Sequence, residues 1–243
     1  MEERMQKIEV CFSPLLYPLY ENPDSIVVVV DILRATSSII TAFHNGVEKL
    51  IPVRTVEEAR TYKNKGYLIA AERDGRILDF ADFGNSPDNF TPDKISGKTV
   101  VYSTTNGTQA IRMAGKHHQV LVGGFLNISA ITEYLISGRR NVLILCAAWK
   151  NKFSLEDSVF AGALTDKLLK TGKFHTICDS AIAARDLWLL AKPNLISYID
   201  KAANRHRLKK LGLDNVIEYC HTQDVTDIIP VLDKDLLVPL KKM

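Results

Sequence analysis

Short apolar runs alternate with amphipathic stretches over the first three quarters of the chain. The runs predict strands because they are rich in β-branched residues and too short for helices; they lie at residues 26–31, 49–53, 68–72, 99–104, 119–125 and 141–148. The stretches between them repeat apolar residues at helical spacing, at 37–46, 55–66, 107–116, 128–138 and 154–172. Buried strands separated by helices predict an α/β fold, a mostly parallel sheet with helices on both faces.

Capping residues support these helix boundaries. Thr55 with Glu58, and Ser154 with Asp157, fit the pattern in which a hydroxyl and an acid three residues later cap a helix. Glycine, which commonly follows the last helical turn, stands where four of the helices should end: Gly46, Gly66, Gly138 and Gly172. The predicted helices are therefore consistent in periodicity and in local chemistry.

The chain after residue 178 is less regular. Residues 179–243 predict helices followed by short strands at 215–222 and 227–232. Because no repeat or linker separates independent units, we expect one α/β domain over residues 1–243. Two closely joined lobes, with a C-terminal sub-lobe at 179–243, are compatible with the same pattern. The loop at 74–98 is unusually long, which is typical of functional loops, and its aromatic residues indicate that it is ordered.

Composition excludes several classes of protein. The 243 residues are 46% hydrophobic and 24% charged, enough for a substantial core. The net charge is +3 with no basic tail, and no apolar run approaches the roughly 18 residues that span a bilayer. The first ten residues lack the apolar segment of a secretory signal. We therefore expect a soluble, cytoplasmic protein without nucleic-acid or membrane partners; a small anionic ligand and a homo-oligomer are compatible with these features.

The four cysteines give no sign of a metal site or a disulfide framework. They are far apart in the chain, without the spacing of paired ligands: Cys11, Cys146, Cys178 and Cys220. Free cysteine is among the most buried residue types. We expect four reduced, largely buried thiols.

Charged side chains follow three of the predicted strands. In open parallel sheets ligands bind beyond the carboxyl ends of the strands, so these residues are candidates for a site: Asp31 and Arg34, Glu72 and Arg73, and Glu156 and Asp157. Four carboxylates in one crevice repel one another unless a cation lies between them. Mg²⁺ suits such a site because it binds one or two carboxylates together with waters and substrate phosphate oxygens.

A second signal is the segment STTNGT, which links a predicted strand to a predicted helix. Its backbone N–H groups and hydroxyls, from Thr104 through Thr105, Asn106 and Gly107 to Thr108, form a candidate anion site, and phosphate is its natural guest. A helix cap followed by a turn explains the same residues structurally.

Structural explanations also exist for the other candidates. Asp31 can cap the helix that starts near Ala35, Asp157 can close the Ser154 capping box, and Glu72 can form a local surface pair with Arg73. His206 lies in a basic stretch typical of a solvated helix face, or contacts a second acidic group of a substrate.

Missing motifs narrow the chemistry. The chain has no GxxxxGK[ST] and no strand-linked GxGxxG, which disfavours a P-loop hydrolase and a dinucleotide site. An aspartyl-phosphate phosphatase would place a second acid two residues after Asp31, where this chain has Leu33. A metal-ligand role for Asp31 is therefore favoured over a nucleophile role, although the covalent route stays open.

Several blocks of the chain together resemble a known family. VVVVDILRATSSIITAFHNGVEKLIPVRTVEEA, AERDGRILDFADFGNSP, GKTVVYSTTNGTQAI, VLVGGFLN and FSLEDSVFAGAL resemble, in the same order, the blocks of the 2-phosphosulfolactate phosphatases. The resemblance spans about residues 8–235. It implies a Mg²⁺-dependent hydrolysis of 2-phospho-3-sulfolactate to 3-sulfolactate and phosphate in coenzyme M biosynthesis, on a family-specific phosphatase fold.

The resemblance and the residues together suggest roles. Asp31 would hold Mg²⁺ with one or more of Glu72, Glu156 and Asp157, while Arg34 and Arg73 would donate to phosphoryl or sulfonate oxygens. In the loop segment GNSP, Asn85 and Ser86 would help to close the site. Three alternatives stay open: a phosphatase or a phosphotransferase for another small phosphorylated acid, and a non-enzymatic anion-binding module.

Overall fold

The structure is a computed structural model that describes residues 5–115 and 119–241. Its core is an eleven-stranded sheet in the order β5-β4-β6-β3-β11-β10-β7-β2-β8-β1-β9. The strands are β1 (Gln6–Cys11), β2 (Ile26–Val30), β3 (Lys49–Pro52), β4 (Leu68–Arg73), β5 (Arg76–Ile77), β6 (Thr99–Ser103), β7 (Gln119–Gly123), β8 (Val142–Cys146), β9 (Phe174–His175), β10 (Pro230–Asp233) and β11 (Leu236–Pro239). All six predicted strands of the βα repeat are present, so the mostly parallel α/β fold is confirmed.

The helices follow the predicted order. They are α1 (Ala35–His44), α2 (Val56–Lys63), α3 (Pro92–Ile95), α4 (Gly107–Ala114), α5 (Ile128–Gly138), α6 (Leu155–Leu169), α7 (Asp179–Ala191), α8 (Leu195–Ile199), α9 (Ala203–Lys210) and α10 (Ile217–His221). Short 3-10 turns lie at Pro14–Leu19, Pro87–Asn89, Phe125–Asn127 and Lys192–Asn194. The last residue predicted for the helix at 107–116, Lys116, lies outside the described residues.

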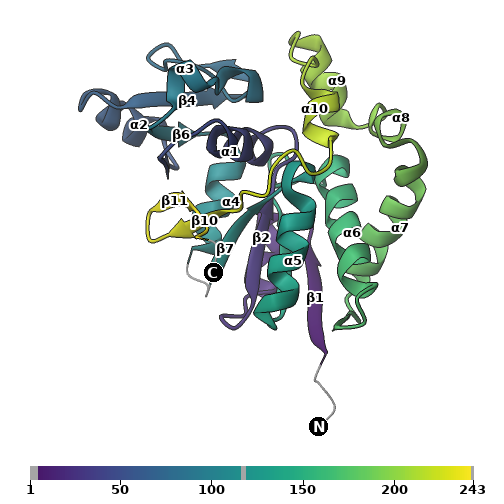
Figure 1. The fold of residues 1–243 in the computed structure, drawn as a ribbon. Helices are drawn as coiled ribbons and strands as arrows, with labels where there is room; N and C mark the ends of the chain where they lie inside the picture. The colour runs from purple at the N-terminus through teal and green to yellow at the C-terminus, as the bar shows by residue number, and fades with distance from the viewer. Residues whose placement is uncertain (1–4, 116–118, 242–243) are drawn as a thin grey trace.

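Helices cover both faces of the sheet, as Figure 1 shows. Val28 and Val30 of β2 point into one core, which is shared with α5, α6 and α7. Val27 and Val29 point into the other core, shared with α1 and α4. Because side chains alternate along a strand, this double burial explains why β2 is a continuous apolar run, and its five residues are all buried.

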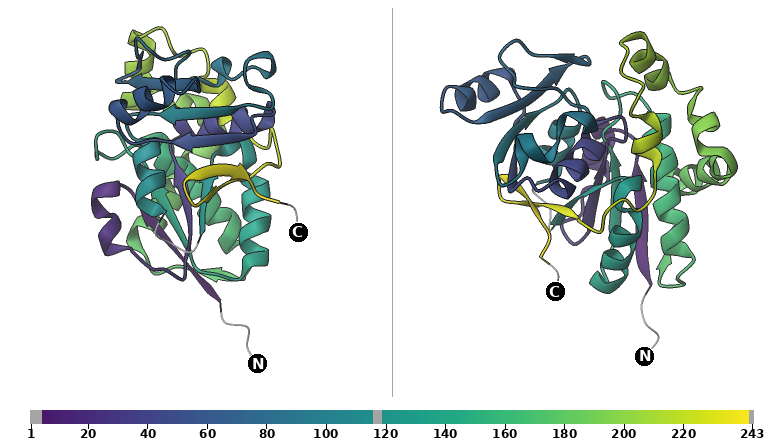
Figure 2. Two further views of the ribbon diagram at one scale, coloured as in Figure 1. Left: turned by 90° about the vertical axis from the view of Figure 1, so that its left-hand side faces the viewer. Right: turned by 45° about the horizontal axis from the view of Figure 1, so that its top comes forward.

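The sheet has two halves, each built mainly of parallel strands. The strands of one half are antiparallel to those of the other. The hairpin β10–β11 pairs antiparallel with β7 on one side and with β3 on the other. Three successive antiparallel pairings reverse the strand direction between β7 and β3. The half with β4 and β6 lies crosswise to β1 and β2 (Figures 1 and 2).

The hydroxyl halves of the two predicted caps form, and one of the predicted glycine ends shifts by a residue. The Thr55 and Ser154 side chains accept hydrogen bonds from the backbone N–H groups of Glu58 and Asp157. Three of the four predicted glycines adopt the left-handed conformation that ends a helix: Gly46, Gly66 and Gly172. After α5 this conformation falls on Arg139 instead.

The prediction for the C-terminal part is wrong at one segment. Residues 215–222, expected to be a strand, contain the helix α10. Ile217, Cys220 and His221 are buried there, and their spacing of three and four residues is that of one helix face. The strand expected at 227–232 begins only at Pro230, and its hairpin partner β11, together with β1 and β9, was not predicted from the pattern.

The long loop at 74–98 is ordered, as expected. It contains the two-residue strand β5 and the short helix α3. Phe83 and Phe90 pack edge to face at a ring-centroid distance of 5.2 Å, and Phe90 packs in turn against Tyr102 of β6. This aromatic packing fixes the loop against the sheet. Asn85 lies in the part of the loop between Phe83 and Phe90.

Candidate active site

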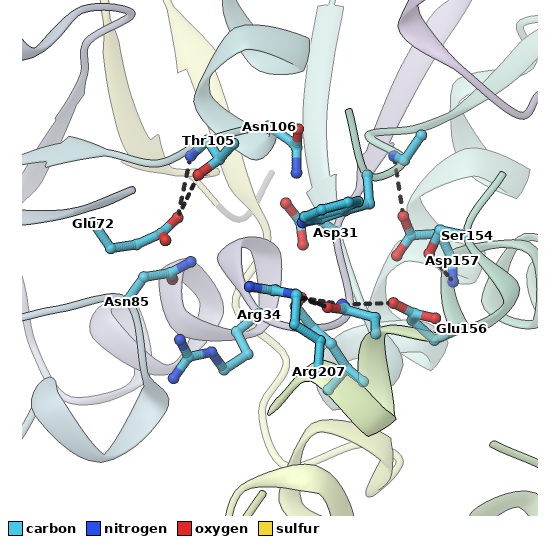
Figure 3. A pocket seen from close by; sticks show the side chains of 14 residues that line it. Asp31, Arg34, Glu72, Asn85, Thr105, Asn106, Ser154, Glu156, Asp157 and Arg207 are labelled. Carbon is cyan, nitrogen blue, oxygen red and sulfur yellow. Dashed lines mark hydrogen bonds between the residues drawn. The ribbon is translucent and has the colours of Figure 1, made fainter. Parts of the chain in front are cut away.

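A narrow cavity lies where the carboxyl ends of β2, β4, β6 and β8 approach one another (Figure 3). Its free volume is about 20 Å³, room for about one water molecule. Eight of the predicted site residues line it: Asp31, Arg34, Glu72, Asn85, Thr105, Asn106, Glu156 and Asp157. A larger cavity of about 590 Å³ shares Trp149, Ser154, Glu156, Asn204 and Arg207 with it.

Asp31 follows the last residue of β2 and is only 9% exposed. Its Oδ1 accepts a hydrogen bond from the N–H of Ala35 at 3.3 Å, so it caps α1 as the structural explanation proposed. Its Oδ2 faces the start of α4 at Gly107. Burial, reinforced by the charges of Glu72 and Glu156, raises the pKa of Asp31 to about 7. One carboxylate oxygen of Asp31 thus caps α1, and the other is directed toward the cavity and α4.

Glu72 ties two loops together. Its Oε1 accepts from the N–H of Thr105 at 3.1 Å, and its Oε2 accepts from the N–H of Gly75 at 2.6 Å. The surface pair with Arg73 is not seen: the Arg73 guanidinium donates to the carbonyl oxygen of Glu72 and to the Ser103 hydroxyl. Because neighbouring residues of a strand point to opposite faces, Arg73 turns away and does not line the cavity.

Glu156 and Asp157 stand on the opposite wall from Glu72 (Figure 3). Asp157 does not close a capping box; its two oxygens accept from the N–H groups of Ile32 at 2.9 Å and Ala148 at 3.2 Å. It thereby holds the loops that follow β2 and β8. Burial raises the pKa of both acids, and for Asp157 the negative charge of Glu156 adds to the effect.

The carboxylates do not form a ready-made metal cluster. Among residues 5–115 and 119–241, no three His, Cys, Asp or Glu side chains lie close enough to hold a metal ion together. Glu72 and Asp157 are committed to backbone donors. The four predicted carboxylates therefore all line the cavity, but they are spread over two of its walls.

Only part of the STTNGT segment faces the cavity. Thr105 and Asn106 line it. Thr104 and Thr108 are buried and exchange hydrogen bonds, each hydroxyl accepting from the other's N–H at 3.3 Å. Their role is the structural one, a cap at the start of α4. Gly107 contributes by its missing side chain, because a Cβ there would lie 3.0 Å from Asp31 Oδ2.

Two further predicted residues do not reach the cavity. Ser86 is buried but absent from the lining, whereas its neighbour Asn85 lines the cavity and accepts a hydrogen bond from the Tyr102 hydroxyl. His206 is exposed on α9, so the structure gives it no contact with the site. Asn204 and Arg207, two residues before it and one after it, line the cavity instead.

The remaining lining residues were missed from the sequence. They are Leu33, Ala148, Trp149, Ser154, Asn204 and Arg207. The signal for Arg207 was present in the basic stretch NRHRLKK, but periodicity does not show which face of a short polar helix turns inward. Trp149 and Ala148 lie in an irregular loop, where no pattern predicts orientation.

Three helices begin at this cavity. Asp31 precedes α1, Asn106 precedes α4, and Ser154 precedes α6. A helix N-terminus carries partial positive charge and unpaired N–H groups, so it favours anions. Together with the buried guanidinium of Arg34, 5% exposed, these ends define an α/β protein with an anion site rich in acids, the chemistry of a phosphate-ester hydrolase.

Comparisons with known proteins identify the family. The family model described as 2-phosphosulpholactate phosphatase matches residues 11–235. A protein of Thermotoga maritima named "Probable 2-phosphosulfolactate phosphatase" is 41% identical over 206 residues, 84% of this chain and 88% of the relative. A protein of Caldanaerobacter subterraneus subsp. tengcongensis with the same name is 36% identical over 218 residues, 87% and 89% of the two chains. A third, from Clostridium novyi, is 37% identical over 207 residues, 84% and 87%.

The chain belongs to the 2-phosphosulpholactate phosphatase family. It is a hydrolase that acts on phosphoric monoesters. Within the described parts of the chain, no helix is both long enough and apolar enough to span a bilayer.

Proposed function

We propose that the protein is a Mg²⁺-dependent phosphatase that hydrolyses 2-phospho-3-sulfolactate to 3-sulfolactate and inorganic phosphate. The observation that carries the proposal is the meeting of three helix N-termini with Asp31 and Arg34 at one narrow cavity. The names of the relatives supply the substrate. The product would be the sulfolactate intermediate that the resemblance implies for coenzyme M biosynthesis.

The phosphoryl group would lie against the N-termini of α1 and α4. There the backbone at Thr105 and Asn106 and the guanidinium of Arg34 offer positive potential. Glu72 holds Thr105 in place through its Oε1. Asn85, fixed by the Tyr102 hydroxyl, lines the same cavity. Thr105, Asn106, Arg34 and Asn85 would orient the ester and would form no covalent bond during hydrolysis.

A cation is needed beside the phosphate because several carboxylates line the cavity. Mg²⁺ fits the residues present, since it is usually bound by one or two carboxylates, waters and substrate phosphate, and needs no cluster of three. We propose Asp31 and Glu156 as its ligands, because both carboxylate oxygens of Glu72 and of Asp157 already accept from backbone donors, whereas Oδ2 of Asp31 does not. When bound, the ion would supply Lewis-acid chemistry at the phosphoryl oxygens.

Hydrolysis forms a bond between phosphorus and a water oxygen and breaks the bond to the ester oxygen, which leaves with the electron pair and takes up a proton. We assign Asp31 the role of a Mg²⁺ ligand and not that of the nucleophile that attacks phosphorus. Its Oδ1 is engaged with α1, and the second acid of the aspartyl-phosphate pattern is replaced by Leu33. Acid-quench trapping of a ³²P-labelled protein would instead support a phosphoaspartate.

The cellular setting is part of the proposal. All four cysteines are free thiols and three are buried, which supports a reducing compartment, because disulfides persist mainly in oxidising ones. We place the reaction in the cytoplasm.

The test is phosphate release from 2-phosphosulfolactate and from a panel of sugar and acid phosphates, each with Mg²⁺ and with EDTA. We expect release from 2-phosphosulfolactate that EDTA abolishes and Mg²⁺ restores. Release from another small phosphorylated acid alone would reassign the substrate. Tight binding of inorganic phosphate with no release from any ester would replace the enzyme by an anion-binding module. Activity in EDTA would remove the metal from the proposal.

A further inference from the structure

Arg207 of α9 has a guanidinium nitrogen without a hydrogen-bond partner at the candidate active site. Its side chain lines both the narrow cavity and the larger one beside it. Nη1 is buried and finds no acceptor among the described residues. Buried donors are almost always paired, because an unpaired one loses its hydration without compensation. A charged donor left in this state at a cavity indicates a place for an anionic acceptor.

The rest of the guanidinium is held in one orientation. Arg207 Nε and Nη2 donate to Asn204 Oδ1 at 3.0 and 2.7 Å. Asn204 Nδ2 in turn donates to Glu156 Oε1 and to the carbonyl oxygen of Leu33, both at 2.8 Å. The Trp149 ring lies below, 5.4 Å from Arg207 Cζ. The orientation of Arg207 is therefore coupled to a site carboxylate through one amide.

Nη1 extends from this anchor across the cavity toward the wall that carries Glu72. A Cβ placed on Gly75 would lie 3.2 Å from Nη1, and the N–H of Gly75 donates to Glu72 Oε2. Figure 3 shows the guanidinium reaching between Glu156 on one side and Glu72 on the other. Arg207, like Arg34, is thus a cation among the carboxylates that line the cavity.

We infer that Arg207 is a catalytic residue, whose Nη1 donates to a non-bridging oxygen of the phosphoryl group, and that Asn204 is its positioning residue. The inference rests on the proposed function. Arginine stabilises the negative charge on the phosphoryl oxygens as the ester bond breaks, and it undergoes no covalent change itself. Because Nε and Nη2 already donate to Asn204, the guanidinium is held with Nη1 as the nitrogen that can donate to a phosphoryl oxygen.

The first experiment compares kcat and KM for Arg207→Ala and Arg207→Lys on two esters, 2-phosphosulfolactate and phospholactate, which lacks the sulfonate. We expect Arg207→Ala to lower kcat about 100- to 1,000-fold, by the same factor on both esters. Added guanidinium ions should restore part of the lost rate. The matched control is Lys209→Ala, an exposed cation on the same helix, which should leave both constants unchanged.

Several outcomes would overturn the inference. Near wild-type kcat in Arg207→Ala would remove the residue from catalysis. A loss confined to 2-phosphosulfolactate would show that Arg207 binds the sulfonate instead. A purely structural role would show in three results together. Guanidinium would not restore the kcat of Arg207→Ala, the melting temperature of Arg207→Ala would be lowered, and Arg207→Lys would have both the melting temperature and the kcat of the wild type.

A second measurement separates this inference from the proposed function. Inorganic phosphate is titrated by calorimetry onto the wild type, Arg207→Ala and Lys209→Ala, which requires no turnover. We expect at least about tenfold weaker phosphate binding for Arg207→Ala, the effect of one lost charged hydrogen bond. If the wild type hydrolysed neither ester, yet Arg207→Ala bound phosphate more weakly in this way, the proposed substrate would fail and the contact of Arg207 with the phosphoryl group would stand. Equal affinities would overturn it.

The role of Asn204 is tested by a double-mutant cycle. Asn204→Ala should lower kcat while KM changes little, because Arg207 keeps its charge but loses its orientation. In the Asn204→Ala background, Arg207→Ala should lower kcat by a much smaller factor than in the wild type, because the two residues act as one unit. Additive losses would separate Asn204 from Arg207.

Discussion

Gly107 lies so close to Asp31 that any side chain at position 107 would meet the carboxylate: a Cβ there would be 3.0 Å from Asp31 Oδ2 and 2.5 Å from the Cβ of Ala35. We predict that Gly107→Ala pushes α4 away from α1 and displaces Asp31. Displacement of a catalytic group by about 1 Å can cost about 100-fold in rate. The measurement is kcat for phosphate release. Gly138→Ala is the control, because its Cβ would only approach the flexible end of Ile26 at 3.3 Å; equal rates in both variants would contradict the prediction.

The raised pKa of Asp31 predicts an unusual stability profile. Burial and the charges of Glu72 and Glu156 raise it from 3.8 to about 7. The folded state then binds this proton more tightly than the unfolded chain, so the contribution of Asp31 to stability falls as pH rises toward 7. We expect Asp31→Asn to be more stable than the wild type at about pH 8, with a smaller difference at about pH 5. Urea unfolding at both pH values tests this, with the exposed Asp24→Asn as control; parallel profiles would count against it.

Mg²⁺ should stabilise the folded protein if Asp31 and Glu156 bind it. A ligand at 100 times its Kd adds about 2.7 kcal/mol to the free energy of unfolding. We predict a melting temperature that rises with MgCl₂ in the wild type and in Glu72→Gln. Asp31→Asn and Glu156→Gln should show no such rise. A Mg²⁺-dependent rise that survives in Asp31→Asn would refute this ligand assignment.

Glu72 should matter for stability as well as for the site. Its carboxylate accepts from the N–H groups of Thr105 and Gly75. Glu72→Ala leaves both donors without this acceptor, which we expect to lower the free energy of unfolding by about 2 kcal/mol. Urea denaturation measures the loss. Glu57→Ala, an exposed acid in the first turn of α2, should change stability little; the idea fails if the two variants are alike.

His221 predicts an acid sensitivity that does not depend on the carboxylates. It is buried in α10, with Nδ1 2.7 Å from the carbonyl oxygen of Ile217 and Nε2 without a partner among the described residues. Burial lowers its pKa from 6.5 to about 4. Its contribution to stability is therefore complete above pH 6.5 and is lost as pH falls through 4. The shift corresponds to about 3 kcal/mol.

The comparison is the pH dependence of unfolding in the wild type and in His221→Phe. The ring of His221 already lies 5.5 Å from that of Phe125, so phenylalanine should fit the site. We expect the difference in stability between the two proteins to grow in favour of the variant between pH 6.5 and 4. A difference that stays constant over this range would rule out His221 as the source.

Local features explain why most of the fold was predictable. The apolar run of β2 and the capping of α6 by Ser154 each depend on neighbouring residues in the chain. Residues 215–222 predict a strand because β-branched and aromatic residues suit strands when seen alone. Packing of Ile217 and Cys220 in the core made this segment a helix.

The candidate site divides in the same way. By itself the sequence determined the alternation of strands and helices, the positions of Asp31 and Glu72 at the ends of predicted strands, and that of Glu156 in the first turn of a predicted helix, because these follow from short-range periodicity. Only the tertiary structure decided that Arg207 faces the cavity while His206 faces solvent, and that the Arg73 guanidinium donates to Ser103 of the neighbouring strand. The physical reason is that side-chain direction is set by contacts between distant segments. Asn204, for instance, bonds Leu33 and Glu156, and β10–β11 joins half-sheets that run in opposite directions.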